Sequence, residues 1–188
     1  MISRRLQVFV SSTYLDLKDE RQAAVQAILS ANHIPAGMEL FAAQDLSQWE
    51  AIKRWIDDSD IHLLILGGRY GSVEQASGKS YTQLEYEYAI EQGKLVFGIV
   101  LTEGFVDRKV ESMGKDAVER SEGGKYEEFR KVVLSRMCRE VDNLDQLQLA
   151  VFHAVTNGAA DVAKDAGWVR AKDVAPWISV APKIPSTR

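Results

Sequence analysis

The chain has 188 residues, of which 46% are hydrophobic and 27% are charged, enough for one domain with a well-formed core. A formal net charge of −4 gives no overall positive field for nucleic acid, and the single cysteine excludes an intramolecular disulfide or a cysteine-based zinc site. The apolar run near the N-terminus is too short for a signal peptide or a membrane span, so we expect a protein of the reduced, cytoplasmic compartment.

The N-terminal part of the chain predicts two strands, each followed by a helix. Residues 6–10 are apolar enough for the first strand, and residues 38–41 for the second. Ser47 and Glu50 have the S-x-x-E spacing of a capping box, which marks the start of the second helix. The first helix is predicted by an apolar stripe at helical spacing, formed by Leu17, Ala24, Ala27, Ile28 and Ala31.

Two longer apolar runs carry the clearest fold signal. Residues 61–66 and 95–101 are almost uniformly apolar, as strands buried on both faces are, and a helical segment between them ends at Gly93. Strands that alternate with helices in this way predict a parallel sheet with helices on both faces. Right-handed crossovers then favour an α/β, flavodoxin-like, three-layer sandwich with four or five strands, ordered 2-1-3-4.

The C-terminal part of the chain gives weaker signals. Residues 103–125 are charged, contain four glycines and lack periodicity, so we expect a mobile connection with at most a short helix. Residues 126–139 and 144–164 are amphipathic and predict two helices, with Cys138 as a small core residue near the end of the first. Residues 167–169 predict a last strand or a packing anchor.

A single domain is therefore expected over residues 1–170, with its core in residues 5–102. Three of the four prolines lie in residues 171–188, which we expect to be a linker or a loose tail. The sequence contains no internal repeat and no low-complexity tract. Function must therefore be sought in the loops of one domain, and not in a repeated surface.

Three strand-to-helix loops should meet at one edge of the sheet, because the carboxyl ends of parallel strands lie together there. These loops are residues 11–14, 42–47 and 67–80, and they contain small hydroxyl residues and a double glycine. Free N–H groups at helix N-termini suit a phosphate or pyrophosphate. The structural alternative is that the serines and threonines cap helices and the glycines form turns.

Glu85 lies near the start of the helix that follows the third strand. Thr82 and Glu85 have capping-box spacing, so Glu85 could satisfy a backbone donor. In a second register Ser80 is the cap and Gln83 its partner, which frees Glu85. Glu85 is four residues before Ala89, on the stripe that should face the sheet, where an acid is costly unless it is used. Spacing alone leaves both readings open.

The other reactive residue types form no comparable pattern. The histidines, His33, His62 and His153, are scattered without the spacing of metal ligands. The sequence has no serine nucleophile elbow, no Walker loop and no G-x-G-x-x-G. We therefore expect neither a metal site nor a bound cofactor.

Four segments of the sequence resemble a family of TIR-like domains of unknown function. They are V-F-V-S-S-T-Y-L-D-L-K-D-E-R from residue 8, G-M-E-L-F from residue 37, S-D-I-H-L-L-I-L-G-G-R-Y-G-S from residue 59, and S-Y-T-Q-L-E-Y-E-Y-A from residue 80. Members of that family are often found at the N-terminus of large STAND-type signalling NTPases. The wider superfamily includes TIR domains and nucleoside 2-deoxyribosyltransferases, which implies a TIR-like fold here.

Both branches of this superfamily imply that Glu85 is an acid acting on an N-glycosidic bond. The order Ser80, Tyr81, Glu85 is similar to that of TIR domains, and the E-x-x-Y-A segment followed by G-K is similar to that of the deoxyribosyltransferases. The resemblance implies a domain of nucleotide-based immune or stress signalling, such as antiphage defence. It would cleave or rearrange the nicotinamide–ribose bond of NAD, with Glu85 as catalytic acid.

The resemblance also implies how the substrate binds and which partners are involved. NAD would be a substrate, with its pyrophosphate on the loops after the first and third strands and a base stacked on an aromatic ring. Self-association and an attached or associated NTPase are expected, but neither nucleic acid nor membrane. The alternatives are an inactive interaction module and a nucleoside N-glycosidase or 2-deoxyribosyltransferase. The expected substrate-binding residues are Ser11, Ser12, Thr13, Tyr14, Asp45, Trp49, Gly67, Gly68, Arg69, Tyr70, Ser80 and Tyr81.

Overall fold

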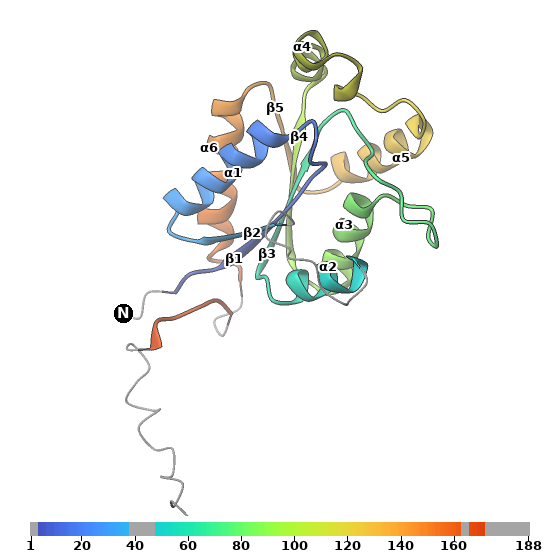
Figure 1. Cartoon of the computed structure of the whole chain (residues 1–188). Coiled ribbons are helices and arrows are strands. Elements are labelled where there is room, and N and C mark those ends of the chain that lie inside the picture. Colours follow the sequence, from blue (N-terminus) through green and yellow to red (C-terminus); the bar gives the residue numbers. More distant parts are fainter. Residues whose placement is uncertain (1–3, 38–47, 163–165, 172–188) are drawn as a thin grey trace, which may run out of the picture.

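The computed structural model describes residues 4–37, 48–162 and 166–171. Their strands form one five-stranded sheet in the order β2-β1-β3-β4-β5, and each neighbouring pair is parallel (Figure 1). This topology confirms the predicted α/β, flavodoxin-like fold. The strands are β1 (Gln7–Ser11), β2 (Ile34–Gly37), β3 (Ile61–Leu66), β4 (Leu95–Leu101) and β5 (Cys138–Val141).

Helices cover both faces of the sheet (Figure 1). One face packs against α1 (Lys18–Ser30) and α6 (Leu144–Gly158). The other face packs against α2 (Gln48–Asp57), α3 (Tyr81–Glu91) and α5 (Gly123–Leu134). Side chains of a strand point alternately to its two faces, so each buried strand supplies both halves of the core.

Strand β2 lies earlier in the chain than predicted. It spans Ile34–Gly37, whereas the predicted strand at 38–41 lies outside the described residues. Pro35 pairs with Val8 of β1, and β2 is an edge strand. A proline has no N–H to donate and is tolerated at a sheet edge, which explains how it fits inside β2. The expected helix cap Ser47 also lies outside the described residues.

The prediction of a mobile connection with at most a short helix at 103–125 is wrong for most of that segment. Helix α4 spans Glu103–Met113, and a 3-10 helix follows at Gly114–Ala117. The Thr102 hydroxyl caps α4 by accepting the Phe105 N–H at 3.2 Å. Phe105 is the only buried residue of α4, because the apolar residues at helical spacing, Val106, Val110 and Met113, are half-buried or exposed and lie among charged residues.

Cys138 was expected on a helix but begins strand β5 instead, because α5 ends at Leu134. Arg139 and Glu140 are exposed in this edge strand, which therefore lacks the apolar run of β3 and β4. Gly98 of β4 lies against Cys138, where an added Cβ would be 3.0 Å from the Cys138 Cβ. The absence of a side chain at Gly98 is what lets β5 pack here.

The last described segment is held through its main chain. Trp168 exchanges two backbone hydrogen bonds with Arg5, at 2.9 and 2.7 Å, in an isolated antiparallel bridge. Its ring remains exposed, so the anchor is the backbone and not the indole. No helix in the described part of the chain is both long and apolar enough to cross a membrane.

Candidate functional site

The crevice of this sheet lies between the carboxyl ends of β1 and β3. These strands are neighbours, but α1 follows β1 on one face and α3 follows β3 on the other. The two loops therefore diverge, and parallel α/β sheets bind ligands at such a point. The structure thus brings the first and third predicted loops together. The second, with Asp45, lies outside the described residues.

Glu85 enters this crevice from the first turns of α3. Its side chain is only 2% exposed, and it accepts a hydrogen bond from the Ser11 hydroxyl at 2.5 Å. The Ser80 hydroxyl caps α3 by accepting the Gln83 N–H at 3.1 Å, so the helix adopts the second register. Glu85 is therefore not the capping acid, and Ser11 at the end of β1 is its partner.

The surroundings of Glu85 place its ionisation near neutral pH. Burial raises the pKa of Glu85 to about 7, while the Ser11 hydrogen bond and the charge of Arg21 oppose the rise. Arg21 is itself buried and donates to the Ser12 hydroxyl at 2.8 Å and to the Val10 carbonyl at 3.2 Å. A buried acid with such a pKa, beside a crevice, is typical of a functional carboxyl.

A pocket of about 250 Å³ opens beside Glu85. Its walls come from the β1–α1 loop, the β3–α3 loop and the start of α3. The predicted site residues that line it are Ser12, Thr13, Tyr14, Arg69, Tyr81 and Glu85. The lining residues that were not predicted are Leu15, Asp16, Gln48, Gly71, Ser72 and Thr82.

Asp16 is the most informative of the residues that the sequence did not indicate. It is 1% exposed, and neither carboxylate oxygen has a hydrogen-bond partner among the described residues. Burial raises its pKa, while the neighbouring Thr13 hydroxyl and the charges of Arg69 and Lys109 oppose the rise. Asp16 lies in a loop between two leucines, and no spacing rule marks it as buried.

Other predicted residues support the site without lining this pocket. Tyr70 is buried, and its hydroxyl donates to the Gln83 side-chain carbonyl at 2.5 Å. Trp49 of α2 packs edge-on against Tyr88 of α3, with ring centroids 5.8 Å apart, and both rings lie against the core between these helices. At Gly67 an added Cβ would be 2.8 Å from a Leu17 methyl carbon, so glycine is needed for close packing.

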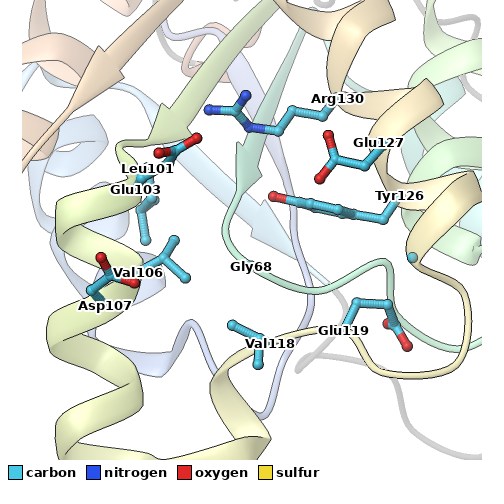
Figure 2. Close-up of a pocket in the computed structure, with 11 residues that line it drawn as sticks. Gly68, Leu101, Glu103, Val106, Asp107, Val118, Glu119, Tyr126, Glu127 and Arg130 are labelled. Carbon is cyan, nitrogen blue, oxygen red and sulfur yellow. The ribbon is translucent and has the colours of Figure 1, made fainter.

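A second pocket, of about 450 Å³, lies over the ends of β3 and β4. Figure 2 shows side chains of α4 and α5 facing each other across it, with Gly68 between them. Its lining carries four carboxylates and one guanidinium. It is lined by Gly68, Leu101, Glu103, Val106, Asp107, Val118, Glu119, Gly123, Tyr126, Glu127 and Arg130.

Glu119 fixes the loop that separates the two pockets. Its carboxylate accepts the N–H of Tyr70 at 3.1 Å, and its own N–H donates to the Gly68 carbonyl at 2.7 Å. Burial acts to raise its pKa, but the N–H groups of Arg120, Ser121 and Tyr70 outweigh it and lower the pKa of Glu119 to about 2. The loop that carries Arg69 is therefore held in place by a charged anchor.

The fold and the crevice define the class of this protein: a TIR-like, flavodoxin-like α/β domain with a buried acid on the helix after β3. Residues 7–156 match the family described as Domain of unknown function (DUF4062), and the chain belongs to this family. No curated protein matches the sequence at a significant level. Family membership therefore fixes the domain type and leaves the activity to be inferred.

A solved structure supports the same fold class. The TIR domains in a structure of the activated Roq1 resistosome, which directly recognises the pathogen effector XopQ, have a TM-score of 0.54 at 12% identity, covering 80% of this chain and 99% of theirs. A diflavin flavoprotein A3 from Nostoc sp. has a TM-score of 0.41 at 13% identity, and the match covers 84% of this chain and 92% of the flavoprotein chain. A flavodoxin from the domain Archaea has a TM-score of 0.35 at 12% identity, and the match covers 82% of this chain and 96% of the flavodoxin chain. At these identities the Roq1 likeness shows the fold alone, and the two lower scores add no argument.

Proposed function

We propose that this domain cleaves or rearranges the nicotinamide–ribose bond of NAD, with Glu85 as the catalytic acid. One observation carries the proposal: Glu85 is buried at the crevice, is not a helix cap, and has a pKa of about 7. Proteins seldom bury an acid in this way for packing alone. A carboxyl that is held by Ser11 and faces a pocket suits catalysis better than a structural role.

Cleavage of the nicotinamide–ribose bond mainly requires a carboxylate that is positioned next to the ribose. Breaking the nicotinamide–ribose bond develops positive charge on the sugar, as glycoside cleavage does. An ionised Glu85 can stabilise that charge or attack the anomeric carbon. The nicotinamide ring is cationic while it is attached to the ribose, and it departs as a neutral molecule. No strong general acid is therefore needed. Arg69 is the guanidinium in the pocket lining, and it suits a phosphate group of the substrate.

The biological setting of the proposal rests on resemblance. The Roq1 TIR domains belong to an assembly that recognises a pathogen effector, so we place the activity in immune or stress signalling. Tyr14 and Leu15 expose apolar surface beside the pocket, which favours self-association or contact with an attached NTPase. The same surface would serve an inactive interaction module, which is the main rival function.

The size of the pocket favours a second candidate. About 250 Å³ suits a nucleoside better than a whole dinucleotide, so part of NAD would extend outside it. A nucleoside N-glycosidase or 2-deoxyribosyltransferase would use the same Glu85. Nucleosides offered beside NAD separate the two enzymes.

The direct test is nicotinamide release from NAD by the purified chain, at low and high protein concentration. Glu85→Gln is the test variant, and Glu91→Gln, an exposed acid of the same helix, is the matched control. Release that is lost in the first variant and kept in the second supports the proposal. Absence of release at both concentrations would overturn it and put the interaction module first.

A further inference from the structure

We infer that Asp16 and Thr13 form a hydroxyl-binding subsite in the Glu85 pocket, and that its ligand is the vicinal diol of a ribose. The inference rests on the proposed function, because it names the part of the substrate that this wall of the pocket recognises. Both residues line the pocket together with Glu85. A subsite here would fix the sugar whose glycosidic bond Glu85 attacks.

The first step in the argument is the unused hydrogen-bonding capacity of this wall. Both carboxylate oxygens of Asp16 and the hydroxyl of Thr13 are buried, and none makes a hydrogen bond of good geometry within residues 4–37, 48–162 and 166–171, although the Thr13 hydroxyl lies close enough to Asp16 to lower its pKa. Native proteins pair nearly all buried polar groups, because an unpaired one costs several kcal/mol. Unpaired oxygens clustered in the wall of a pocket point to donors that come from a ligand.

The second step concerns the cations beside Asp16, which already have other partners. Arg69 donates from Nη1 to the Asp116 carbonyl at 2.9 Å. Lys109 forms a buried ion pair with Glu20, with 2.7 Å between Nζ and Oε1. Both cations act on Asp16 through space, but neither donates a hydrogen bond to it. The carboxylate oxygens thus remain available to a neutral donor.

The third step is the chemistry of the ligand. A carboxylate accepts two hydroxyl donors at once, and a threonine hydroxyl can either donate or accept. Acidic side chains bind ribose hydroxyls in dinucleotide-binding folds for the same reason. A phosphate is disfavoured beside Asp16 and suits Arg69 instead. A vicinal diol on a phosphorylated sugar therefore matches both ends of this wall.

The carboxylate of Asp16 packs against main chain on one side and is covered by an exposed stretch of loop on the other. At Gly67 an added Cβ would be 3.3 Å from Asp16 Oδ2, so the carboxylate packs against the main chain of the β3–α3 loop. Between Thr13 and Asp16 lie Tyr14 and Leu15, which are 57% and 61% exposed. A ligand that reaches the covered oxygens must displace this exposed stretch.

The experiment compares ribose 5-phosphate with 2-deoxyribose 5-phosphate, each titrated at millimolar concentrations and followed by NMR chemical shifts. The wild-type chain should bind the ribose form at least about tenfold more tightly, since the deoxy sugar leaves a buried acceptor unpaired. Asp16→Asn and Thr13→Val should each reduce this preference. Asp19→Asn, an exposed acid of α1, is the matched control and should keep it.

Equal affinity for the two sugars, or no binding of either, would overturn the subsite. So would an Asp16→Asn variant that keeps the full preference. A melting curve above neutral pH separates this role from a structural one. If Asp16 binds a ligand, Asp16→Asn removes an unpaired buried charge, and its melting temperature should equal or exceed that of wild type. If Asp16 has a structural role instead, the variant should melt at a lower temperature than wild type. If that variant does not fold, Thr13→Val carries the same comparison.

The outcome is independent of the NAD assay. Ribose preference without Glu85-dependent nicotinamide release keeps the subsite and rejects the proposed reaction. Glu85-dependent release without ribose preference keeps the reaction and rejects the subsite. Neither measurement can therefore stand in for the other.

Discussion

The Ser11 hydroxyl donates a hydrogen bond to the Glu85 carboxylate, and this bond joins the last residue of β1 to helix α3. It is the point at which two segments far apart in sequence meet over the carboxyl edge of the sheet. Because the bond favours the ionised form of Glu85 while burial opposes it, Ser11 tunes the charge of the site as well as its geometry.

Replacement of Ser11 by alanine should raise the pKa of Glu85 above about 7, because it removes a hydrogen bond that stabilises the carboxylate. Any activity that needs ionised Glu85 should then shift to higher pH, and the free energy of unfolding should fall by about 1 kcal/mol. The pKa can be followed by carbon NMR of the Glu85 carboxyl. Ser112→Ala, at an exposed position of α4, provides the control, and an unchanged Glu85 titration would contradict this role.

The gain in stability of Glu85→Gln over wild type should be larger at high pH than at low pH. The folded-state pKa of Glu85 is raised from 4.5 to about 7, so the folded protein holds a proton that the unfolded chain releases. Wild-type stability therefore falls as pH rises between these values, by up to about 3 kcal/mol, and the variant lacks this fall. Urea unfolding at about pH 5 and about pH 8 measures the difference. The same stability difference at both pH values would contradict the burial argument.

Glu119→Gln should destabilise the protein at neutral pH but not in strong acid. The pKa of Glu119 is lowered from 4.5 to about 2, so its contribution is present above 4.5 and is lost as pH falls towards 2. Partial exposure reduces the expected effect to about 1–2 kcal/mol. Unfolding curves of both proteins across this range should converge at the acidic end. Persistence of the full difference there would show that the Glu119 charge is not the cause.

Lys109→Met should destabilise the domain by about 3–5 kcal/mol, because it leaves the buried carboxylate of Glu20 without its partner. The double variant Glu20→Gln with Lys109→Met should recover much of this loss, since the Glu20 carboxylate is then no longer left without its partner. Urea unfolding measures both effects. The control Lys115→Met lies at an exposed position and should change stability little. If the double variant is as unstable as Lys109→Met, the effect comes from packing.

The sequence predicts the centre of the fold because β3 and β4 are buried on both faces and so read as continuous apolar runs. Helix α4 and strand β5 escape prediction for the opposite reason. Phe105 is the single buried residue of α4, and Val141 is the single buried residue of β5. Val106, Val110 and Met113 have helical spacing in α4 but are not fully buried and lie among charged residues, so the helix depends on tertiary packing.

The same limit applies to the site. Glu85 could be identified because helical spacing places it on the inner stripe of α3, whereas the choice of capping register required the Ser80–Gln83 bond. Asp16 could not be identified, because its burial depends on the close approach of the Gly67 main chain from a distant loop. Local patterns reveal which face a residue occupies, but not which unpaired atoms surround it.

The Glu119 anchor described above has a consequence for both pockets. Gly68 faces one pocket, Arg69 lines the other, and the short chain between them is clamped to the segment that leads into α5. The main chain at Gly68 and Arg69 is therefore a wall that both pockets share, and its position is set by a carboxylate that lies outside the Glu85 pocket.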